Sequence, residues 1–518
     1  MNGAESLVRT LIAGGVDVCF TNPGTSEMHF VAALDRVEGM RCVLGLFEGV
    51  VTGAADGYYR MTGTPASTLL HLGPGLGNGL ANLHNAKKAR SGIVNIIGEH
   101  AGYHIQHDAP LTSDIEGIAR PMSDWIRRAA SSQTVAADGA LAIEAACEPP
   151  GRIATLILPA DTAWNDAAGP AVARTRSAPA MVEDAAINAG AQALRRGAQS
   201  MLMLGGAALR GEALELAGRI AARTGCRLMA EFNNARMECG AGRVPVPRLP
   251  YAVDSALAAL AGVADLVLVG AKMPVSFFAY PGKPSVLVPE GCNVMRVAGV
   301  EHDLPQVLAA LADALGAPHT AAAVAERKTR PLPGGAPTTD GIAAVIAHLL
   351  PEHAIVVDES VSTGRGFASA MTGAAPHDWL NIMGGSIGWG LPAGVGAAIA
   401  CPGRKVVVLE GDGSAMYTQQ ALWTMARERL DVTIVLFANR AYKILQGELA
   451  NVGAGVAGRR AIDMLTLDRP DLDWISIARG QGVDGERAHD LDGLARALAR
   501  GLAARGPYLV ELVIPPGA

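Results

Sequence analysis

The sequence predicts an α/β protein with three doubly wound parallel-sheet domains. Short apolar runs rich in β-branched residues alternate with segments of roughly 10–18 residues that have apolar side chains at helical spacing. The short runs are apolar on both faces, as expected for parallel strands covered by helices on both sides. The length of 518 residues corresponds to about three domains at ~150 residues each.

The predicted strands fall into three groups separated by two linkers rich in proline, glycine and alanine, residues 166–184 and 316–339. The domains are therefore expected at residues 1–165, 185–315 and 338–518. The runs interpreted as strands are VDVCF, RCVLGL, ASTLLHL, GIVNIIG and RIATLIL in the first domain, SMLML, CRLMAEF, DLVLVG and SVLVP in the second, and AIVVD, KVVVLEG, VTIVLFAN and YLVELVI in the third.

Composition excludes several classes of protein. The chain has 43 Lys and Arg against 49 Asp and Glu, a net charge of −6, and no long basic run, which argues against a nucleic-acid partner. No stretch approaches the ~18 apolar residues of a membrane span, and the first residues lack a signal peptide's apolar core. The seven scattered cysteines contain no C-x-x-C pair and are interpreted as small buried hydrophobes, so a cytoplasmic protein is expected.

The strongest motif is one βαβ unit in the last domain. A predicted strand over Lys405–Glu410 runs into Gly411-Asp412-Gly413-Ser414, a helix follows over about Ala415–Arg429, and a second strand, Val432–Ala438, ends at Asn439. A right-handed crossover brings the carboxyl ends of both strands to one edge of the sheet. Asp412 and Asn439 are therefore expected to lie close together.

This pattern suits a diphosphate bridged to the protein by Mg²⁺. Mg²⁺ binds a few protein oxygens together with phosphate and water, and the glycines allow backbone N–H groups to approach an anion. A bare strand-to-helix turn capped by Asp or Ser is the alternative for GDGS alone. The dinucleotide pattern G-x-G-x-x-G is not met at the glycine-rich loops. The candidate metal ligands are Asp412, Asn439 and Ala441, and the candidate cofactor-binding residues here are Gly411, Asp412, Gly413, Ser414 and Asn439.

GDG with a closing Asn resembles the motif of thiamine-diphosphate-dependent enzymes, in the branch of acetolactate synthase and benzoylformate decarboxylase. Other segments agree in order and spacing, chiefly in the first and last domains: FTNPGTSE, EGVVTGAADGYYRMTG, LHLGPGLGNGLANLHNA, PPGRIATLILPAD, GGSIGWGLPAGVGAAIA and GDGSAMYTQQALWTMA. The resemblance implies a pyrimidine-binding first domain, a middle domain and a diphosphate- and Mg²⁺-binding last domain. It also implies a homodimer or homotetramer whose active sites lie between subunits.

The same resemblance assigns roles to residues near the cofactor. Glu48 follows an apolar strand and begins a helix, where burial disfavours a charged carboxyl. Without the resemblance, it is interpreted as an acidic residue of the first helical turn that interacts favourably with the helix dipole. By resemblance, Glu48 is catalytic and hydrogen-bonds the cofactor's aminopyrimidine ring. Ile387, after Gly385, resembles the apolar wedge that keeps the cofactor bent, and Ser360 is a weaker candidate for a cofactor contact.

Substrate contacts are also inferred from the resemblance. His71 precedes a Gly-Pro-Gly turn and is a candidate proton donor, against the alternative of a core histidine. Thr25 matches a substrate-contacting hydroxyl, or else is a helix N-cap. His104 and His107 lie in a loop where related decarboxylases use histidines, although the two are not adjacent.

Two departures from the sequence pattern of related decarboxylases bear on which substrate is used. The middle-domain stretch that carries an active-site histidine in benzoylformate decarboxylase is MPVSFFAYPG here, which makes Phe277 a candidate substrate contact. Pyruvate-type decarboxylases place a glutamate where this chain has Leu445, which indicates an apolar pocket like that of the synthases.

The predicted activity is therefore the thiamine-diphosphate- and Mg²⁺-dependent decarboxylation of a 2-oxo acid, with carboligation to a second carbonyl compound slightly favoured. The alternatives are a simple decarboxylase of benzoylformate decarboxylase type that releases an aldehyde, a 2-hydroxyacyl thioester lyase, and a non-catalytic cofactor-binding paralogue. The basic cluster Arg327–Arg330 is the only support for the lyase. FAD on the middle domain is possible in the synthase group, but the middle segment shows no flavin signature.

Overall fold

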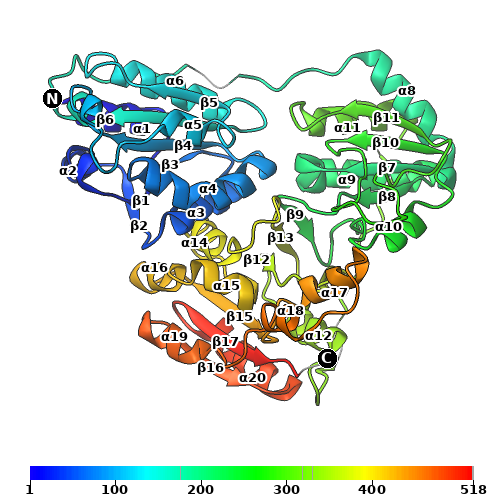
Figure 1. Ribbon diagram of the computed structural model, residues 1–518. Coiled ribbons are helices and arrows are strands. Elements are labelled where there is room, and N and C mark those ends of the chain that lie inside the picture. Colours follow the sequence, from blue (N-terminus) through cyan, green and yellow to red (C-terminus); the bar gives the residue numbers. More distant parts are fainter. Residues whose placement is uncertain (175–176, 318, 329–330, 516–518) are drawn as a thin grey trace.

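Three β-sheets organise the chain, each in its own lobe, as the sequence predicts (Figure 1). The computed structural model describes residues 1–174, 177–317, 319–328 and 331–515. The amino-terminal and middle lobes lie side by side above the carboxyl-terminal lobe in this view. Within the described residues, no helix has the length and apolar character needed to cross a membrane.

The first sheet has six parallel strands in the order β2-β1-β3-β4-β6-β5. All seven residues of β4 are buried, as expected for a central strand with helices on both faces. The strands are β1 Val18–Asn22, β2 Arg41–Leu44, β3 Ala66–Leu70, β4 Ile93–Glu99, β5 Trp125–Arg128 and β6 Ile153–Pro159. The helices are α1 Gly3–Ala13, α2 Met28–Arg36, α3 Glu48–Thr62, α4 Leu72–Ala89, α5 Ile115–Ala119, α6 Val135–Cys147 and α7 Ala160–Trp164, with short 3₁₀ turns η1 Thr25–Glu27 and η2 Ile105–His107.

The middle sheet has four parallel strands in the order β11-β10-β7-β8. Its strands are β7 Ser200–Leu204, β8 Arg227–Ala230, β10 Asp265–Val269 and β11 Asn293–Ala298. Its helices are α8 Asp184–Leu194, α9 Gly211–Thr224, α10 Val253–Leu260 and α11 Leu304–Leu315, with 3₁₀ turns η3 Gly197–Gln199 and η4 Gly206–Leu209. The predicted strand SVLVP is wrong: only an isolated bridge at Val286 forms there, between two prolines that lack the N–H a ladder needs.

The third sheet has seven strands in the order β16-β17-β15-β14-β12-β13-β9. Its last strand, β9 Met237–Cys239, comes from the middle of the chain and pairs antiparallel with β13. The other strands are β12 Ala354–Glu359, β13 His377–Asn381, β14 Val406–Gly411, β15 Val432–Ala438, β16 Asp484–Ala488 and β17 Tyr508–Val513. The helices are α12 Thr339–Leu349, α13 Phe367–Met371, α14 Gly390–Ala400, α15 Asp412–Thr418, α16 Ala421–Arg427, α17 Lys443–Asn451, α18 Arg459–Asp463, α19 Trp474–Gly480 and α20 Leu491–Ala503.

The helix predicted over Ala415–Arg429 is in fact two helices, α15 and α16, and it begins earlier, at Asp412. The interruption coincides with a side chain from another segment. The Gln481 side chain accepts a hydrogen bond from Trp423 N at 3.3 Å and donates one to Gln419 Oε1 at 3.1 Å. Gln481 thus supplies the acceptor that the interrupted helix cannot.

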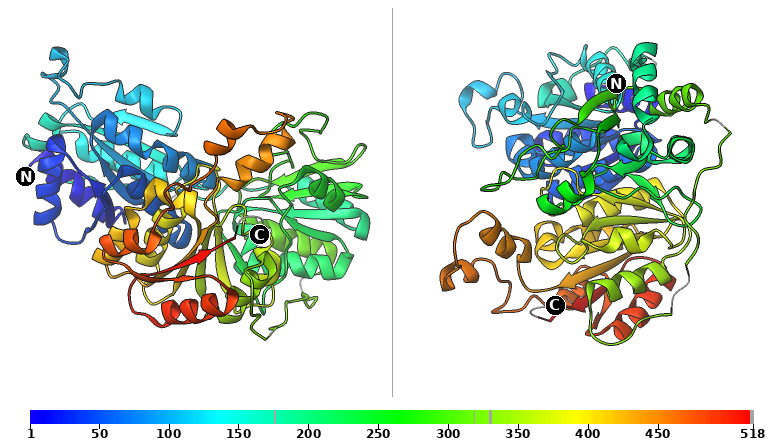
Figure 2. Two further views of the ribbon diagram at one scale, coloured as in Figure 1. Left: turned by 60° about the horizontal axis from the view of Figure 1, so that its bottom comes forward. Right: turned by 90° about the vertical axis from the view of Figure 1, so that its right-hand side faces the viewer.

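The first lobe packs on the third through α3 and α14, and glycines permit the contact. A Cβ placed at Gly57 would lie 2.2 Å from the carbonyl oxygen of Ala393, and one at Gly396 would lie 1.9 Å from that of Ala54. Part of the chain's glycine content therefore serves close helix packing. Figure 2 shows the two lobes stacked, with α17 and α18 standing out from the third lobe.

All seven cysteines are free. Cys19 and Cys226 are buried as expected, but Cys42 is exposed, so it is not one of the buried hydrophobes that the sequence predicts. Its place in the short edge strand β2 explains the difference, because that strand has a sheet partner on one side only.

Candidate active site

The carboxyl ends of β12 and β14 mark a point where the strand order of the third sheet reverses. The two strands are neighbours, with Glu359 opposite Glu410, and the chain continues from β12 to β13 on one side and from β14 to β15 on the other. In open α/β sheets, ligands bind in the crevice at such a point. Ser360 and the GDGS segment follow these two strands directly, so topology places a ligand site here.

The structure brings the three predicted metal ligands together. Asp412 accepts two hydrogen bonds, from Gly413 N to Oδ1 at 2.9 Å and from Arg440 N to Oδ2 at 2.7 Å. Asn439 Oδ1 accepts a hydrogen bond of 2.9 Å from Ala441 N. The turn after β15 therefore lies directly against the Asp412 carboxylate, as the βαβ interpretation predicts.

This donor set fits a hard cation such as Mg²⁺. An ionised carboxylate has about four lone-pair sites, and the two backbone N–H groups leave some of them for a metal. Burial raises the pKa of Asp412 to about 6, and the N–H groups of Arg440 and Gly413 oppose that rise. Within the described residues, no group of three or more His, Cys, Asp or Glu side chains could hold a metal. A cation at Asp412 would therefore also need amide, backbone and ligand oxygens.

The other predicted diphosphate residues surround the same crevice. Gly411 is the N-cap of α15, and Ser414 is buried in its first turn. A Cβ at Gly413 would lie 2.6 Å from Cε1 of Tyr442, so this position needs glycine for packing. The Ser360 hydroxyl donates to Oδ1 of Asp358 at 2.5 Å, so in this structure it is directed toward a neighbouring carboxylate.

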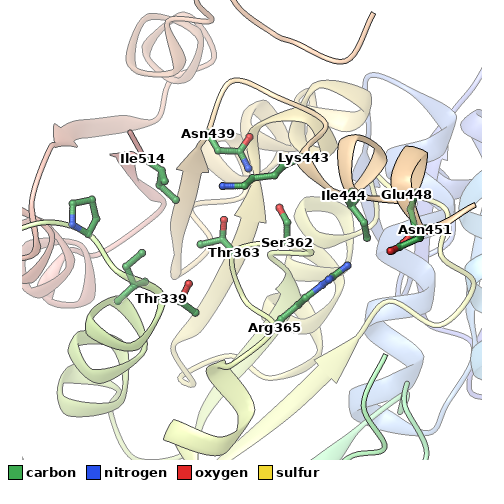
Figure 3. Close-up of a pocket in the computed structure, with 13 residues that line it drawn as sticks. Thr339, Ser362, Thr363, Arg365, Asn439, Lys443, Ile444, Glu448, Asn451 and Ile514 are labelled. Carbon is green, nitrogen blue, oxygen red and sulfur yellow. The ribbon is translucent and has the colours of Figure 1, made fainter. Parts of the chain in front are cut away.

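A pocket of about 290 Å³ opens beside Asn439 at this edge (Figure 3). The loop after β12 contributes Ser362, Thr363 and Arg365, and α17 contributes Lys443 and Ile444. Asn439 is the only predicted site residue among the described residues that line it. Leu445, predicted to border an apolar substrate pocket, is 46% exposed and does not line this pocket, which α17 lines with Lys443, Ile444, Gly447, Glu448 and Asn451.

Gly385 and Ile387 lie in the loop between β13 and α14. Gly385 has a φ of +73°, which favours glycine, and a Cβ there would lie 2.8 Å from Cζ of Phe277. The structure therefore brings Phe277 of the middle lobe against the predicted cofactor loop.

Phe277 belongs to a group of aromatic rings that reaches the third lobe. Its ring centroid lies 5.6 Å from that of Tyr251 and 4.9 Å from that of Phe278. The Tyr251 hydroxyl donates to Oε1 of Glu448 at 3.3 Å, and the Arg365 guanidinium lies 4.8 Å from the centre of the Tyr251 ring. Burial is the main cause of a raised pKa at Tyr251. This aromatic group thus lies between the cofactor loop and two residues that line the pocket, Arg365 and Glu448.

Glu48 begins α3 and is 8% exposed. Its Oε2 accepts a hydrogen bond of 3.0 Å from Asn78 Nδ2. A Cβ at Gly75 would lie 3.1 Å from Oε1 of Glu48 and 3.3 Å from Cβ of His71. The two predicted catalytic residues therefore flank the same glycine of the first lobe.

His71 is paired with a buried carboxylate. Its Nδ1 lies 2.8 Å from Oε2 of Glu27, and its side chain is 24% exposed, so it is not an enclosed core histidine. Glu27 also accepts hydrogen bonds from Gly24 N at 2.7 Å and from Ser26 Oγ at 2.6 Å. These contacts fix Glu27, and Glu27 in turn orients the imidazole, leaving Nε2 as the ring nitrogen available for proton transfer.

The other predicted substrate contacts of the first lobe are exposed. Thr25 is exposed and is the first residue of η1, whose N-cap is Gly24, so the N-cap alternative for Thr25 is wrong. His104 and His107 are exposed and form a row of rings with His100, with centroids 5.5 and 5.6 Å apart. Among the described residues, no hydrogen bond links His104 or His107 to His71 or Glu48.

One asparagine joins the Glu48 helix to the Ile387 loop within the same chain. Asn82 Nδ2 donates to the carbonyl oxygen of Gly49 at 2.8 Å and to that of Gly388 at 3.0 Å. The neighbouring Asn85 also contacts the loop, since Asn85 Nδ2 donates to the carbonyl oxygen of Ser386 at 2.7 Å. Helix α4 therefore connects the helix that begins at Glu48 in the first lobe to the Ile387 loop of the third lobe in the same chain.

Sequence reasoning missed three residues that the structure places in this site. Glu27 lies within the FTNPGTSE segment and Glu359 directly precedes Ser360, so both stood beside residues already singled out. Asn78 lies in a glycine-rich helix and gave no signal of its own. Of the basic cluster Arg327–Arg330, residues 329 and 330 lie outside the described residues.

Comparison with known proteins agrees with this geometry. Residues 1–118 match the family model described as "Thiamine pyrophosphate enzyme, N-terminal TPP binding domain", and residues 363–512 match that of the C-terminal TPP binding domain. The chain belongs to the thiamine pyrophosphate enzyme family. The first matched region contains Glu48 and His71, and the second contains Asp412 and Asn439. The predicted cofactor residues therefore lie in the two domains that bind thiamine diphosphate in this family.

Individual relatives lie in the branch that the sequence suggested. A Mycobacterium tuberculosis protein provisionally named acetolactate synthase large subunit IlvX is 52% identical over 99% of both chains. Benzoylformate decarboxylase of Pseudomonas aeruginosa is 32% identical over 96% of both chains. The solved structure of a Rhodococcus jostii thiamine-diphosphate-dependent 4-hydroxybenzoylformate decarboxylase superposes with a TM-score of 0.85 at 25% identity, covering 100% of this chain and 99% of that one.

Proposed function

We propose that this protein is a thiamine-diphosphate- and Mg²⁺-dependent decarboxylase of 2-oxo acids that protonates its product and releases an aldehyde. The observation that carries this proposal is the 2.8 Å contact between His71 Nδ1 and Oε2 of Glu27. A histidine oriented by a buried carboxylate is suited to proton transfer near neutral pH. Release of an aldehyde requires such a step, because a proton must replace the lost CO₂.

The family's cofactor, when bound, stabilises the carbanion left by loss of CO₂. The protein's own residues bind and orient it. Asp412, with Asn439 and Ala441, would hold Mg²⁺ and the diphosphate, and Glu48, held by Asn78, would form a hydrogen bond with the aminopyrimidine ring. The proposed active site lies between two subunits, with Glu48 from one chain and Asp412 from the other.

The aromatic group next to the cofactor loop supports a substrate with an aryl or bulky apolar side chain. Phe277 lies against the predicted cofactor loop and continues into Tyr251 and Phe278. Aromatic rings favour offset or edge-on contacts with another ring. Two relatives are named for aryl-substituted 2-oxo acids, benzoylformate and 4-hydroxybenzoylformate, and the same class is proposed here.

Carboligation is the second candidate. It is supported by the departure at position 445, where this chain has a leucine and the resemblance to pyruvate-type decarboxylases would place a glutamate. The name of the 52% identical relative points the same way. In that case the cofactor would allow the carbon group left after loss of CO₂ to be transferred to a second carbonyl compound, and His71 would protonate the new alkoxide oxygen.

Variants of the His71–Glu27 pair test the proposed proton transfer, and the product of the unaltered protein separates decarboxylation from carboligation. With an aryl 2-oxo acid, thiamine diphosphate and Mg²⁺, His71→Ala is expected to lower aldehyde release by about 10²–10⁴-fold. Glu27→Gln should lower it less, because the imidazole loses only its orienting carboxylate. The control is His29→Ala, which removes a histidine that packs on Trp164 in the same lobe and should leave turnover unchanged. Normal aldehyde release by His71→Ala would refute the proposed proton transfer, and a ligated product from the unaltered protein would favour carboligation.

A further inference from the structure

The loop that carries Ile387 has little regular structure of its own. It connects β13 to α14 and includes two glycines with positive φ, Gly385 at +73° and Gly388 at +90°. Its shape must therefore be fixed by side chains from elsewhere. Two of these have been described, Asn82 and Asn85 of α4, which bind the loop from the first lobe.

A buried carboxylate holds the end of the same loop from the third lobe. Glu359 accepts hydrogen bonds from Gly388 N and Trp389 N, both at 2.8 Å, and from Gly390 N at 2.5 Å. Gly390 begins α14, and the first N–H groups of a helix have no acceptor within the helix. One side chain therefore satisfies three backbone donors and places negative charge at the start of an 11-residue helix.

Glu359 is buried and closely packed at this contact. It is the last residue of β12, is 1% exposed and lies beside Glu410 across the sheet. A Cβ at Gly390 would lie 2.3 Å from Oε2 of Glu410 and 3.0 Å from Cβ of Glu359, so the helix approaches closely only because residue 390 is glycine. Burial raises the pKa of Glu359 to about 7, while the three N–H groups and the neighbouring Glu410 side chain counteract that rise.

We propose that Glu359 is a positioning residue for the cofactor: by fixing the N–H groups of residues 388–390, it sets the loop that presents Ile387 to thiamine diphosphate. The proposal rests on the proposed role of Ile387. It predicts that the charge of Glu359 matters for cofactor binding through its contacts with the loop. A carboxamide in its place has a single acceptor oxygen and two donor hydrogens facing backbone donors.

The test uses the full chain at pH 8 and has two parts. Hydrogen–deuterium exchange of the cofactor-free protein reports directly on the amides of residues 388–390. Titration with thiamine diphosphate and Mg²⁺ by calorimetry reports the dissociation constant. Glu359→Gln is expected to accelerate exchange at 388–390 and to weaken cofactor affinity by about tenfold or more. The control is Asp265→Asn, which changes a buried carboxylate paired with Arg196 in the middle lobe and should alter neither reading.

The outcomes are distinct. Unchanged exchange at residues 388–390 in Glu359→Gln would show that the carboxylate does not hold the loop and would overturn the proposal. Faster exchange with unchanged affinity would overturn it too, because the loop's order would then be irrelevant to the cofactor. If Glu359→Gln does not fold, Glu359→Asp is measured in both parts: its shorter side chain withdraws the carboxylate from the three N–H groups, so faster exchange and weaker affinity are expected, and unchanged readings would overturn the proposal. Failure of the proposed decarboxylation would leave both readings intact, since neither measures turnover.

Discussion

Trp389 Nε1 donates a hydrogen bond of 2.7 Å to Oδ2 of Asp56. Trp389 precedes α14 of the third lobe and Asp56 lies within α3 of the first, so the bond crosses the contact between the lobes. Asp56 also forms a buried ion pair of 2.7 Å with Arg60, whose guanidinium lies 4.3 Å from the centre of the Trp389 ring. Trp389 is also bound through its backbone to Glu359. The lobe contact and the cofactor loop therefore share a residue.

Asp56→Asn is expected to destabilise the protein strongly. It leaves the buried Arg60 guanidinium without a counter-charge, and breaking a buried pair from one side costs about 3–5 kcal/mol. Denaturant unfolding followed by tryptophan fluorescence gives the free energy of unfolding. The comparison is Glu5→Gln, which breaks an ion pair with an Arg36 side chain that is 63% exposed and should cost no more than about 1 kcal/mol. Equal losses in the two variants would contradict the assigned importance of the lobe contact.

Asp412→Ala should abolish the Mg²⁺ dependence of cofactor binding. Removing the carboxylate leaves only neutral oxygen donors, which bind a divalent cation weakly. Calorimetric titration with thiamine diphosphate, with Mg²⁺ and after its removal by a chelator, checks this. Asp431→Ala serves as control, because Asp431 lies before β15 at the opposite edge of the sheet and pairs with Lys405. An Asp412→Ala protein that retains wild-type affinity and Mg²⁺ dependence would remove Asp412 from the metal site.

Glu231 is expected to make stability depend on pH. Burial raises the pKa of Glu231 from 4.5 to about 7, while the N–H of Lys272 counteracts the rise. The folded protein thus binds this proton more tightly than the unfolded chain, so the free energy of unfolding falls as pH rises from about 4.5 to about 7. Glu231→Gln should remove about 1–3 kcal/mol of that decline. Unfolding curves of both proteins at pH 5 and pH 8 measure it; parallel declines would contradict the raised pKa.

Mixing two inactive variants tests whether the active site is shared between subunits. Glu48→Gln and Asp412→Ala should each be inactive as homodimers. A hybrid dimer would contain one site with both residues intact if Glu48 and Asp412 come from different chains. Unfolding and refolding the two together should therefore restore about a quarter of wild-type turnover, since half of randomly assembled dimers are hybrids with one working site each. No recovery, with hybrids demonstrated by differential tagging, would place both residues in one chain's site.

The sequence predicted the parts of this structure that depend on local pattern. Apolar runs and turn residues placed β14 and β15 to within a residue, and the βαβ rule placed Asp412 against Asn439–Ala441. It did not reveal contacts between residues distant in the sequence. The pairing of His71 with Glu27, the capping of α14 by Glu359 and the addition of β9 to the third sheet all depend on how separate segments meet. Helix α17 shows the limit at fine scale, because the sequence did not show which of its residues line the pocket and that Leu445 is exposed.

The central claim is most directly tested by measuring CO₂ release from a panel of 2-oxo acids, with thiamine diphosphate and Mg²⁺ present or withheld. Each reaction is run with and without an acceptor aldehyde, and the organic product is identified. The account predicts cofactor-dependent CO₂ release, fastest with aryl or bulky apolar 2-oxo acids and matched one-to-one by the corresponding aldehyde. Absence of CO₂ release from every acid of the panel by protein shown to bind the cofactor would contradict it.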